Sequence, residues 1–383
     1  MNTLLNQNQE QNMREAHVAD FLSRRINHPK LNDALKQLED TLWQKSHPDI
    51  MVLTGPTGVG KSTLAKKLEQ RIQERFATDM RRQVDMVPVL HLSILSAGSS
   101  TFNWKELYSR MLQQLSSVSP QLTLPFDTDE MMLIDEPIKL GRSAPTANSL
   151  QSALGKAVKK RGVRAIILDE ANQLLLGHKA QEQSRQYEIL KSLAASTSAV
   201  IILVGTYDLL SIQEQSAQLV RRTRIIKLPH YHRTDKDDWE SFCSSLSTLI
   251  SWMNLPRQPD LLHKAEYFYL KSAGCIGILK PWLDSAYEYC REHGLDQLDM
   301  DVVEQLAPEN RSILTILKEA QAGEIRLQDI PMDELRQHCL LGEKDYKESH
   351  HYRDGDNHRY GKPKQKRRPG ERHPTRDQTG WRP

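Results

Sequence analysis

The chain lacks the features of a membrane or secreted protein. No apolar run in its 383 residues approaches the roughly 18 residues that a membrane-spanning helix needs. The first residues, Met1 to Asn12, are rich in Asn and Gln and lack the apolar centre of a signal peptide. Only four cysteines are present, and their spacing shows no paired metal motif. We therefore expect a cytoplasmic protein with no membrane partner and with reduced, mostly structural thiols.

The chain also lacks a strong net charge, because its formal charge is only +3. The last residues, Asn357 to Pro383, hold nine Lys or Arg and two Asp or Glu, so they carry +7 and the remainder about −4. A nucleic-acid surface on the body must then be a local patch, not a general basic field. The basic run Lys362 to Arg368 is suited to DNA phosphates or an acidic partner, although a solubilising tail has the same composition.

A complete phosphate-loop motif, G-x-x-x-x-G-K-[ST], follows the apolar run Ile50–Leu53 and opens a helical stretch. This strand–loop–helix context is the one in which the motif holds a nucleotide. Its predicted nucleotide-binding residues are Gly55, Pro56, Thr57, Gly58, Val59, Gly60, Lys61, Ser62 and Thr63.

Each residue type in the loop has a chemical reason. Glycines allow backbone N–H groups to converge on phosphate oxygens, and the start of the following helix favours negative charge. Lys61 is expected to reach the β- and γ-phosphates, and the Ser62 hydroxyl to hold Mg²⁺. The chain is therefore predicted to bind ATP or GTP with Mg²⁺.

Apolar strands alternate with helical patterns along the first two thirds of the chain, which predicts a five-stranded, parallel, doubly wound α/β sheet. From Asp235 to about Leu327 only helical patterns occur, and after about Glu343 aliphatic residues are so few that we expect disorder. The predicted parts are a leader (1–30), an α/β core (31–233), a small helical domain (234–327) and an extension with a basic tail (328–383). The expected strands are Ile50–Thr54, Val87–Leu92, Ala165–Leu168, Val200–Val204 and Arg224–Leu228.

Two segments read as an apolar strand ending in Asp-Glu, the pair that nucleotide hydrolysis needs near Mg²⁺. Met131–Glu136 is rich in Met and lies within Ser116–Pro145, which we interpret as a surface insertion. Ala165–Glu170 follows a helix-stop signal and has the β-branched residues of a core strand. We therefore predict Asp169 as the acid beside Mg²⁺ and Glu170 as the base that polarises the attacking water.

Three later residues are candidates for sensing the nucleotide or completing its site. Thr206 follows the strand Val200–Val204, where its hydroxyl is suited to hold water or the γ-phosphate, although a plain strand-end turn has the same sequence. Arg221 and Arg222 precede the last strand, where one of them is suited to reach the γ-phosphate of a neighbouring subunit. A solvated basic face is the alternative for this pair.

The ordered motifs, followed by a helical segment, resemble the AAA+ ATPases, which implies a P-loop AAA+ sheet with a small helical lid. Further short segments make about residues 15–325 similar to the TnsC/TniB transposition ATPases. The segments that carry this resemblance are Arg24–Leu31, Thr101–Lys105, Asp169–Asn172, Gly205–Thr206 and Gly274–Gly277.

The resemblance implies an ATPase that assembles on duplex DNA as a hexameric or heptameric ring or a helical filament. ATP hydrolysis is implied to dismantle this assembly. Its implied partners are a TnsB-like or TnsA-like transposase and a target selector of the TniQ or TnsD type, in some members with a CRISPR effector. It places Ile26 and His28 near the adenine, and Lys105 and Thr146 at the DNA backbone. One departure is that Lys280 stands where many AAA+ lids have an arginine.

Two other functions are compatible with the same core. A replication-type helicase loader or initiator usually has an added DNA-reading domain, and no helix-turn-helix pattern follows the predicted lid. A signalling NTPase that binds no DNA would also have a mildly acidic body, so composition does not exclude it. Retention on duplex DNA in the presence of ATP would separate this last class from the other two.

Overall fold

The computed structural model describes residues 18–94, 102–117, 131–133, 136–138, 145–175, 180–211 and 217–340. By compactness the chain divides into one unit, Met1–Leu327, and a second, Gln328–Pro383. The described part of the second unit contains helix α15 (Met332–Leu340), and the predicted basic tail lies outside the described residues. In the described ranges, no helix combines the length and the apolarity needed to cross a membrane.

The first unit contains a five-stranded sheet in which every pairing is parallel, as predicted. The strand order is β2-β5-β6-β1-β7, so β1 lies in the interior between β6 and β7. The strands are β1 (Ile50–Thr54), β2 (Val89–Ser93), β5 (Ala165–Asp169), β6 (Val200–Gly205) and β7 (Thr223–Lys227).

The second strand begins two residues later than the sequence predicts. Val87 donates its backbone N–H to the Arg161 carbonyl, at 2.9 Å, and not to a neighbouring strand. Pro88 has no N–H to donate, and its carbonyl accepts from the N–H of Arg164 at 2.8 Å. The ladder with β5 therefore starts at Val89, which pairs with Ala165.

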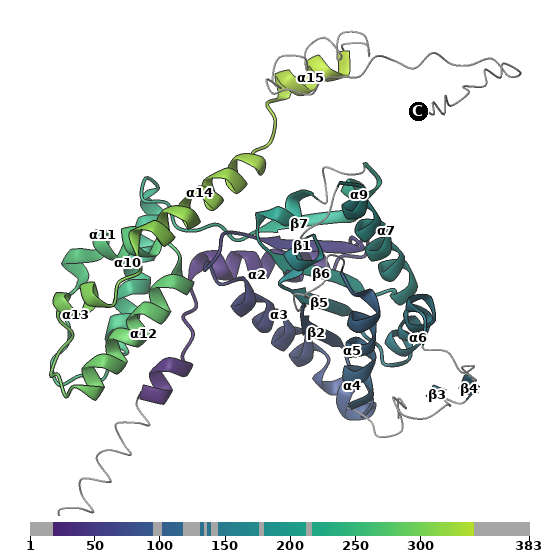
Figure 1. Ribbon diagram of the computed structural model, residues 1–383, viewed down its shortest axis with the longest axis horizontal. Helices are drawn as coiled ribbons and strands as arrows, with labels where there is room; N and C mark the ends of the chain where they lie inside the picture. Colours follow the sequence, from purple (N-terminus) through teal and green to yellow (C-terminus); the bar gives the residue numbers. More distant parts are fainter. Residues whose placement is uncertain are drawn as a thin grey trace, which may run out of the picture. The chain divides into compact units, whose positions relative to one another are not determined.

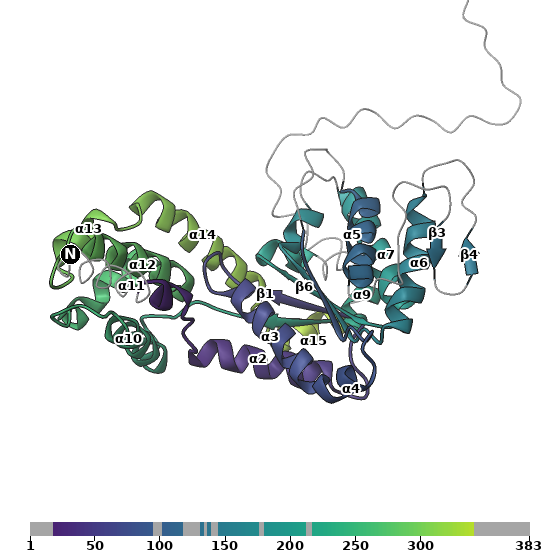
Figure 2. The same cartoon turned by 90° about the horizontal axis from the view of Figure 1, so that it is seen from below.

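Helices cover both faces of this sheet (Figures 1 and 2). One face carries α2 (Pro29–Leu42) and α3 (Lys61–Arg75), whose apolar side chains pack with Met51 and Leu53 of β1. The opposite face carries α5 (Trp104–Ser117), α6 (Ala147–Lys160) and α7 (Ala180–Thr197), which pack with the alternate residues of the strands. This two-sided burial explains the continuous apolar runs in the sequence. Two further short helices lie in the same part of the chain: α4 (Ala77–Arg82) and α9 (Ala217–Arg222).

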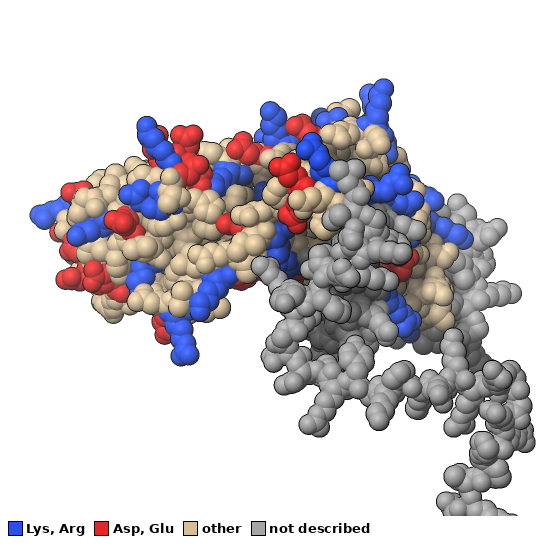
Figure 3. Space-filling view, turned by 90° about the horizontal axis from the view of Figure 1, so that it is seen from above, with Lys and Arg blue, Asp and Glu red and all other residues tan. Residues whose placement is uncertain are grey.

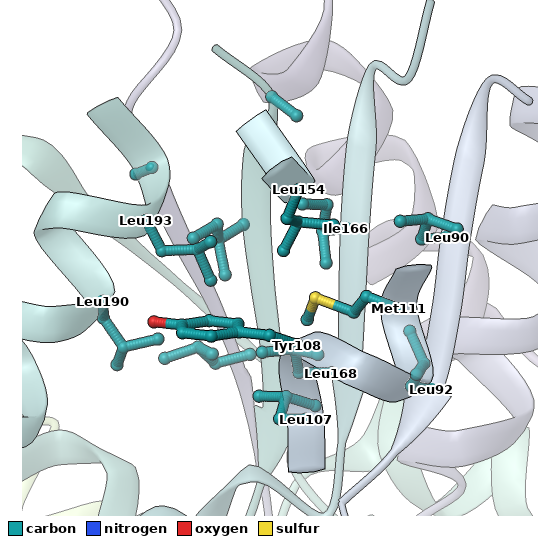
Figure 4. Close-up of a cluster of buried hydrophobic side chains, with 14 of the residues drawn as sticks. Leu90, Leu92, Leu107, Tyr108, Met111, Leu154, Ile166, Leu168, Leu190 and Leu193 are labelled. Carbon is teal, nitrogen blue, oxygen red and sulfur yellow. The ribbon is translucent and has the colours of Figure 1, made fainter. Parts of the chain in front are cut away.

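Figure 4 shows the core on the α5 face of the sheet. Tyr108 and Met111 of α5 lie against Leu90, Ile166 and Leu168 of the adjacent strands, and all five side chains are almost fully buried. Burying one such side chain contributes about 1.5–3 kcal/mol relative to leaving it exposed. The strands that end at the candidate site are therefore held by a dense apolar layer.

The segment Met131–Glu136 does not join the main sheet. Its first residues form β3 (Met131–Leu133), which pairs antiparallel with β4 (Glu136–Ile138) in a separate two-stranded sheet. Ala165–Asp169 instead lies in the main sheet between β2 and β6. The choice of the second apolar segment as the core strand is therefore confirmed. Residues 118–130, 134–135 and 139–144 of the predicted insertion lie outside the described residues.

Residues after β7 are helical, as predicted for the described residues up to Leu327. Aromatic side chains, among them Phe242, Phe268 and Tyr287, form a third apolar cluster, and Phe21 from the helical residues 18–23 is buried in it. Part of the predicted leader thus belongs to the core of this helical region. All four cysteines are free thiols. The helices of this region are α10 (Lys236–Ser251), α11 (Ala265–Ser272), α12 (Ile276–Glu292), α13 (Met300–Gln305) and α14 (Asn310–Arg326).

Candidate nucleotide site

The phosphate loop connects the end of β1 with the start of α3. Gly58 and Gly60 have φ angles of 77° and 108°, a region that side chains other than glycine rarely adopt. Gly60 is the N-cap of α3, which has no side-chain cap and no acidic residue in its first turn. The first N–H groups of α3 are therefore available to an anion, as a phosphate site requires.

Lys61 lies folded over this loop. Its Nζ donates to the carbonyls of Gly55 and Pro56 at 2.9 and 2.8 Å. Burial lowers the pKa of Lys61, while the negative charges of Glu319 and Glu170 act in the opposite direction. A positive charge at the mouth of the loop is thus held near the position that phosphates would take. The next residue, Ser62, is exposed.

The parallel register brings the ends of three strands to one edge. Thr54 at the end of β1 pairs with Gly205 at the end of β6, and the Thr54 hydroxyl donates to the Thr206 carbonyl at 2.9 Å. Asp169 ends the neighbouring strand β5 and is 9% exposed. The phosphate loop, Thr206 and Asp169 therefore meet where ligands of open α/β sheets bind.

Glu170 has an unusual backbone conformation for its residue type. Its φ and ψ angles are 56° and 36°, in the left-handed region, and its N–H donates to Asp169 Oδ1 at 2.9 Å. Such strain costs about 1–3 kcal/mol and concentrates at functional sites. The Glu170 side chain is exposed just beyond the strand edge, so it can meet water.

Gly205 and Asn172 pack between these strand ends, a contact that no sequence motif predicts. A Cβ atom at Gly205 would lie 2.9 Å from Leu209 Cδ1 and 3.0 Å from Asn172 Oδ1. The Asn172 oxygen is buried without a hydrogen-bond partner in the described part of the chain. A larger residue would have to displace these neighbours, so Gly205 lets the segments after β5 and β6 approach closely. The Thr206 hydroxyl donates to Asp208 at 3.2 Å.

The side chains at this edge of the sheet fit a nucleotide with bound Mg²⁺, which the sequence predicts. Mg²⁺ prefers oxygen ligands, and its sites in nucleotide enzymes use one or two side chains together with substrate phosphates. Ser62 and Asp169 supply a hydroxyl and a carboxylate at the loop and at the neighbouring strand end. The uncapped N-terminus of α3 and the Lys61 amine match the charge of a phosphate chain.

A cavity of about 220 Å³ adjoins the phosphate loop. It is formed by the leader, the loop and the start of α12, which are far apart in the sequence. The predicted adenine contacts Ile26 and His28 both line it, and the His28 Nδ1 atom lies 3.0 Å from the Tyr231 hydroxyl. Its lining also includes Leu22, Leu31, Val59, Gly60, Thr63, Ile276, Gly277 and Lys280.

The start of α12 packs directly on the phosphate loop. A Cβ atom at Gly277 would lie 2.4 Å from the Gly58 carbonyl oxygen, and one at Gly58 would lie 2.4 Å from Ile278 Cγ1. Lys280, at the position where many lids have an arginine, pairs with Asp284 and donates to the Phe21 carbonyl at 3.2 Å. Its charge is therefore neutralised within the helical region.

Comparison with known proteins agrees with this geometry. Residues 44–213 match the family model of the AAA domain. The crystal structure of Cdc6p from Pyrobaculum aerophilum is similar over 75% of this chain and 69% of that chain, with 13% identity and a TM-score of 0.51. The ORC2 protein from Aeropyrum pernix, in ADPNP–ADP complexes, is similar over 84% and 74%, with 17% identity and a TM-score of 0.46. No curated protein matches the sequence.

The fold is the AAA+ P-loop fold. The family match begins before β1 and ends after η2 (Tyr207–Leu210), so it includes the phosphate loop, Asp169, Glu170 and Thr206. The residues that meet at the edge of the sheet thus all lie within the matched AAA domain.

Arg221 and Arg222 lie far from the phosphate loop of their own AAA+ core. They end α9 immediately before β7, and both are exposed. Arg222 pairs with Asp49 at 3.1 Å, and Asp49 precedes β1. Because β1 and β7 are parallel, this is the opposite edge of the sheet from the loop. The two arginines can serve a phosphate loop only in another copy of the chain.

The two predicted DNA contacts lie at the starts of neighbouring helices. Lys105 is exposed in the first turn of α5, and Thr146 is the exposed N-cap of α6. The Thr146 hydroxyl accepts the Ser149 N–H at 3.2 Å, so a helix-capping role explains this residue without DNA. The structure brings the two positions onto adjacent helices, and their contact with DNA stays a prediction.

We predict that Gly277→Ala weakens nucleotide binding. The added methyl group would meet the backbone of the phosphate loop at Gly58, which cannot rotate away as a flexible side chain can. Overpacking of this kind costs about 1–3 kcal/mol, which corresponds to roughly a 5- to 150-fold loss of affinity. Titration with a fluorescent ATP analogue and Mg²⁺ measures the effect. Ser285→Ala, at an exposed position of the same helix, is the control, and equal affinity of the two variants would contradict the expected contact.

We predict that His28 makes the protein less stable in acid. Burial, with smaller contributions from the charges of Lys30 and Lys67, lowers the pKa of His28 to about 4. Between pH 6.5 and 4 the unfolded chain binds a proton that the folded chain does not, so stability falls as the pH falls. Between these two pH values, the free energy of unfolding is expected to fall by about 3 kcal/mol.

The change in unfolding free energy between pH 7 and pH 5, from urea denaturation, checks this prediction. His28→Gln is expected to lose less stability over this interval than the wild-type protein does. His263→Gln, at a side chain that is 57% exposed, is expected to behave as the wild type. The same pH dependence in all three proteins would contradict the prediction, because it would show that folding does not lower the pKa of His28.

Proposed function

We propose that the protein is an ATPase that assembles, when ATP is bound, as a ring or filament on duplex DNA. In this proposal it connects the selection of a target site with the transposase during DNA transposition, and hydrolysis dismantles the assembly. The observation that carries the proposal is the separation of the phosphate loop from Arg221 and Arg222, which lie at opposite edges of one sheet. A second copy is required to bring either of these two arginines to the nucleotide.

Within one copy, each residue of the strand edge has a proposed task. Lys61 and the loop amides bind the phosphates of ATP, and Ser62 and Asp169 hold Mg²⁺, which screens the phosphate charge when bound. Glu170 accepts a hydrogen bond from the attacking water and orients it. Thr206, between the other two strand ends, holds the water or the γ-phosphate.

An arginine supplied by a neighbouring subunit would explain why assembly depends on ATP. Contact between one edge of a subunit and the opposite edge of the next is heterologous, and such contacts generate closed rings or open helical filaments. A γ-phosphate at this interface would attract the arginine of the neighbour, and its loss would remove that attraction. Arg221 is the better candidate, because Arg222 already pairs with Asp49.

The proposed contact with DNA is supported by two positions on the surface. Lys105 presents a cation and the start of α6 at Thr146 presents the positive end of a helix dipole, both of which suit backbone phosphates. On the face shown in Figure 3, Lys and Arg side chains are interspersed with Asp and Glu, so a contact there must be confined to small patches. The proposed transposase and the TniQ or TnsD-type selector, with or without a CRISPR effector, follow from the sequence resemblance.

A replication-type loader or initiator is the second candidate. The likeness to Cdc6p concerns the fold, and this fold is shared by both candidates. After α14, the described residues contain one further helix, α15, of 9 residues, which is too short to form a helix-turn-helix by itself. Stimulation of a transposase in the presence of ATP and target DNA would favour the first candidate, and loading of a helicase the second.

We predict that Glu170→Gln binds ATP and stays on DNA. The amide keeps the shape of the carboxylate but does not act as a base, so hydrolysis is expected to fall by about 100-fold or more. ATPase assays and gel-shift dissociation on duplex DNA measure the two effects. Glu188→Gln, on the surface helix α7, is the control. Hydrolysis at the wild-type rate would show that Glu170 is not the base.

We predict that Arg221→Ala lowers hydrolysis without removing ATP binding. The arginine would act on the nucleotide of a neighbour, so the affinity of a single subunit for ATP is expected to change less than threefold. The loss in turnover is expected to reach roughly 10³-fold, in the range of known arginine fingers. Arg222→Ala tests the adjacent residue. Activity of Arg221→Ala equal to the wild type, with Arg222→Ala impaired, would reassign the role to Arg222.

A further inference from the structure

Two histidines flank a buried tyrosine in the segment that leads from β7 into the helical region. Tyr231 is 2% exposed, and its N–H donates to the Gly274 carbonyl at 3.1 Å. In an extended segment, residues two apart lie on the same side. His230 and His232 accordingly lie side by side, with ring centroids 4.3 Å apart.

Glu324 of α14 faces these two imidazoles. Its Oε1 atom lies 3.0 Å from His230 Nδ1 and 3.6 Å from His232 Nε2. The preceding residue, Gly323, touches Tyr207 so closely that a Cβ atom would lie 2.0 Å from the tyrosine ring. This contact fixes α14 against the core and thereby fixes the position of the carboxylate.

The close approach of His230 and Glu324 is not a well-formed hydrogen bond. Within the described residues, neither His230 Nδ1 nor Glu324 Oε1 has a hydrogen-bond partner of acceptable geometry, although the two atoms are only 3.0 Å apart. The His230 side chain is 7% exposed, so water does not readily compensate. Buried polar atoms in this condition require an explanation, and a bound ion is one that satisfies both atoms at once.

We propose that His230 Nδ1, His232 Nε2 and Glu324 Oε1 form a binding site for Zn²⁺ or a similar divalent transition-metal ion. One ligand atom from each of the three residues lies within 4.8 Å of the other two. Ligands in a tetrahedral zinc site, bound at about 2.0–2.1 Å, are roughly 3.3 Å apart, close to the separations of 3.0 and 3.6 Å between Glu324 and the two histidines. Imidazole and carboxylate are common zinc ligands, and the 40% exposure of His232 leaves room for water as the fourth ligand.

Further hydrogen bonds hold the backbone of both histidines. The Lys30 amine donates to the His230 carbonyl at 2.8 Å, and the His232 N–H donates to Asp238 Oδ2 at 2.8 Å. Lys30 and Asp238 form an ion pair with each other at 2.5 Å. The backbone positions of both histidines are therefore fixed before a metal binds, which lowers the entropy cost of forming the site.

The metal would fasten α14 to the segment between β7 and α10. The same helix carries Glu319, whose carboxylate accepts a hydrogen bond from the Thr57 hydroxyl of the phosphate loop at 3.2 Å. Metal binding is therefore expected to stabilise the arrangement in which α14 lies on the loop. This inference does not depend on DNA binding or on transposition.

Binding of Co²⁺ and Zn²⁺ to the full-length protein, after removal of bound metal with a chelator, tests the site. The wild-type protein is expected to bind one Co²⁺ more than Glu324→Gln or His232→Gln does, with visible absorption bands of four-coordinate cobalt that Zn²⁺ abolishes. Loss of one ligand is expected to lower the affinity for the metal by more than about 100-fold. Loss of a residue that only hydrogen-bonds to a ligand typically lowers it by about 10- to 100-fold. Both variants change partly exposed side chains, which limits damage to the fold.

The control is His263→Gln, an exposed histidine in the same unit, which is expected to bind Co²⁺ as the wild type does. Zn²⁺ is also expected to raise the melting temperature of the wild type and of this control, but not of the two ligand variants. Equal metal binding by the wild type and Glu324→Gln would overturn the proposal, because the metal would then be held elsewhere in the chain. Failure of the wild type to bind Zn²⁺ at micromolar concentration would overturn it as well.

Discussion

The parallel pairing of β1 with β6 is the constraint on which the candidate site depends. The register that pairs Thr54 with Gly205 places the phosphate loop directly beside the segment that follows β6. The next pairing, of β6 with β5, adds Asp169 and Glu170 at the same edge. A shift of one residue in either ladder would turn alternate side chains to the wrong face of the sheet. The apolar layers on both faces therefore fix the chemistry at the edge as well as the stability of the core.

The helical region does not only cover the candidate site as a lid would. It also contacts the phosphate loop directly. The start of α12 lies against Gly58, the leader residue His28 lines the adjoining cavity, and α14 reaches both Thr57 and Tyr207. Contacts of this kind connect the phosphate loop with the segment at His230, which leads into α10. A change at the nucleotide can thus alter the position of α12 and α14 through direct packing, since closely packed elements do not deform continuously.

The sequence predicted the part of this structure that depends on local patterns. The phosphate loop is a contiguous motif, and the β-branched run Ala165–Leu168 distinguished the core strand from the methionine-rich alternative. The first strand was predicted at its observed bounds, whereas the start of β2 was misplaced because Pro88 interrupts the ladder. The packing of Gly277 on the loop and the approach of Glu324 to His230 join residues that are distant in the sequence. No local pattern encodes such contacts, because they result from the folding of the whole unit.

Imaging of the protein with duplex DNA tests the central claim most directly, which is that ATP assembles subunits whose sites are completed by a neighbour. Negative-stain microscopy and size-exclusion chromatography, with Mg²⁺ and a non-hydrolysable ATP analogue, should show rings or filaments on DNA. Those assemblies should be absent without nucleotide and in Lys61→Ala, which lacks the amine beside Gly55 and Pro56. Monomers under every condition, with ATP binding intact, would contradict the account and favour an NTPase that acts alone and without DNA.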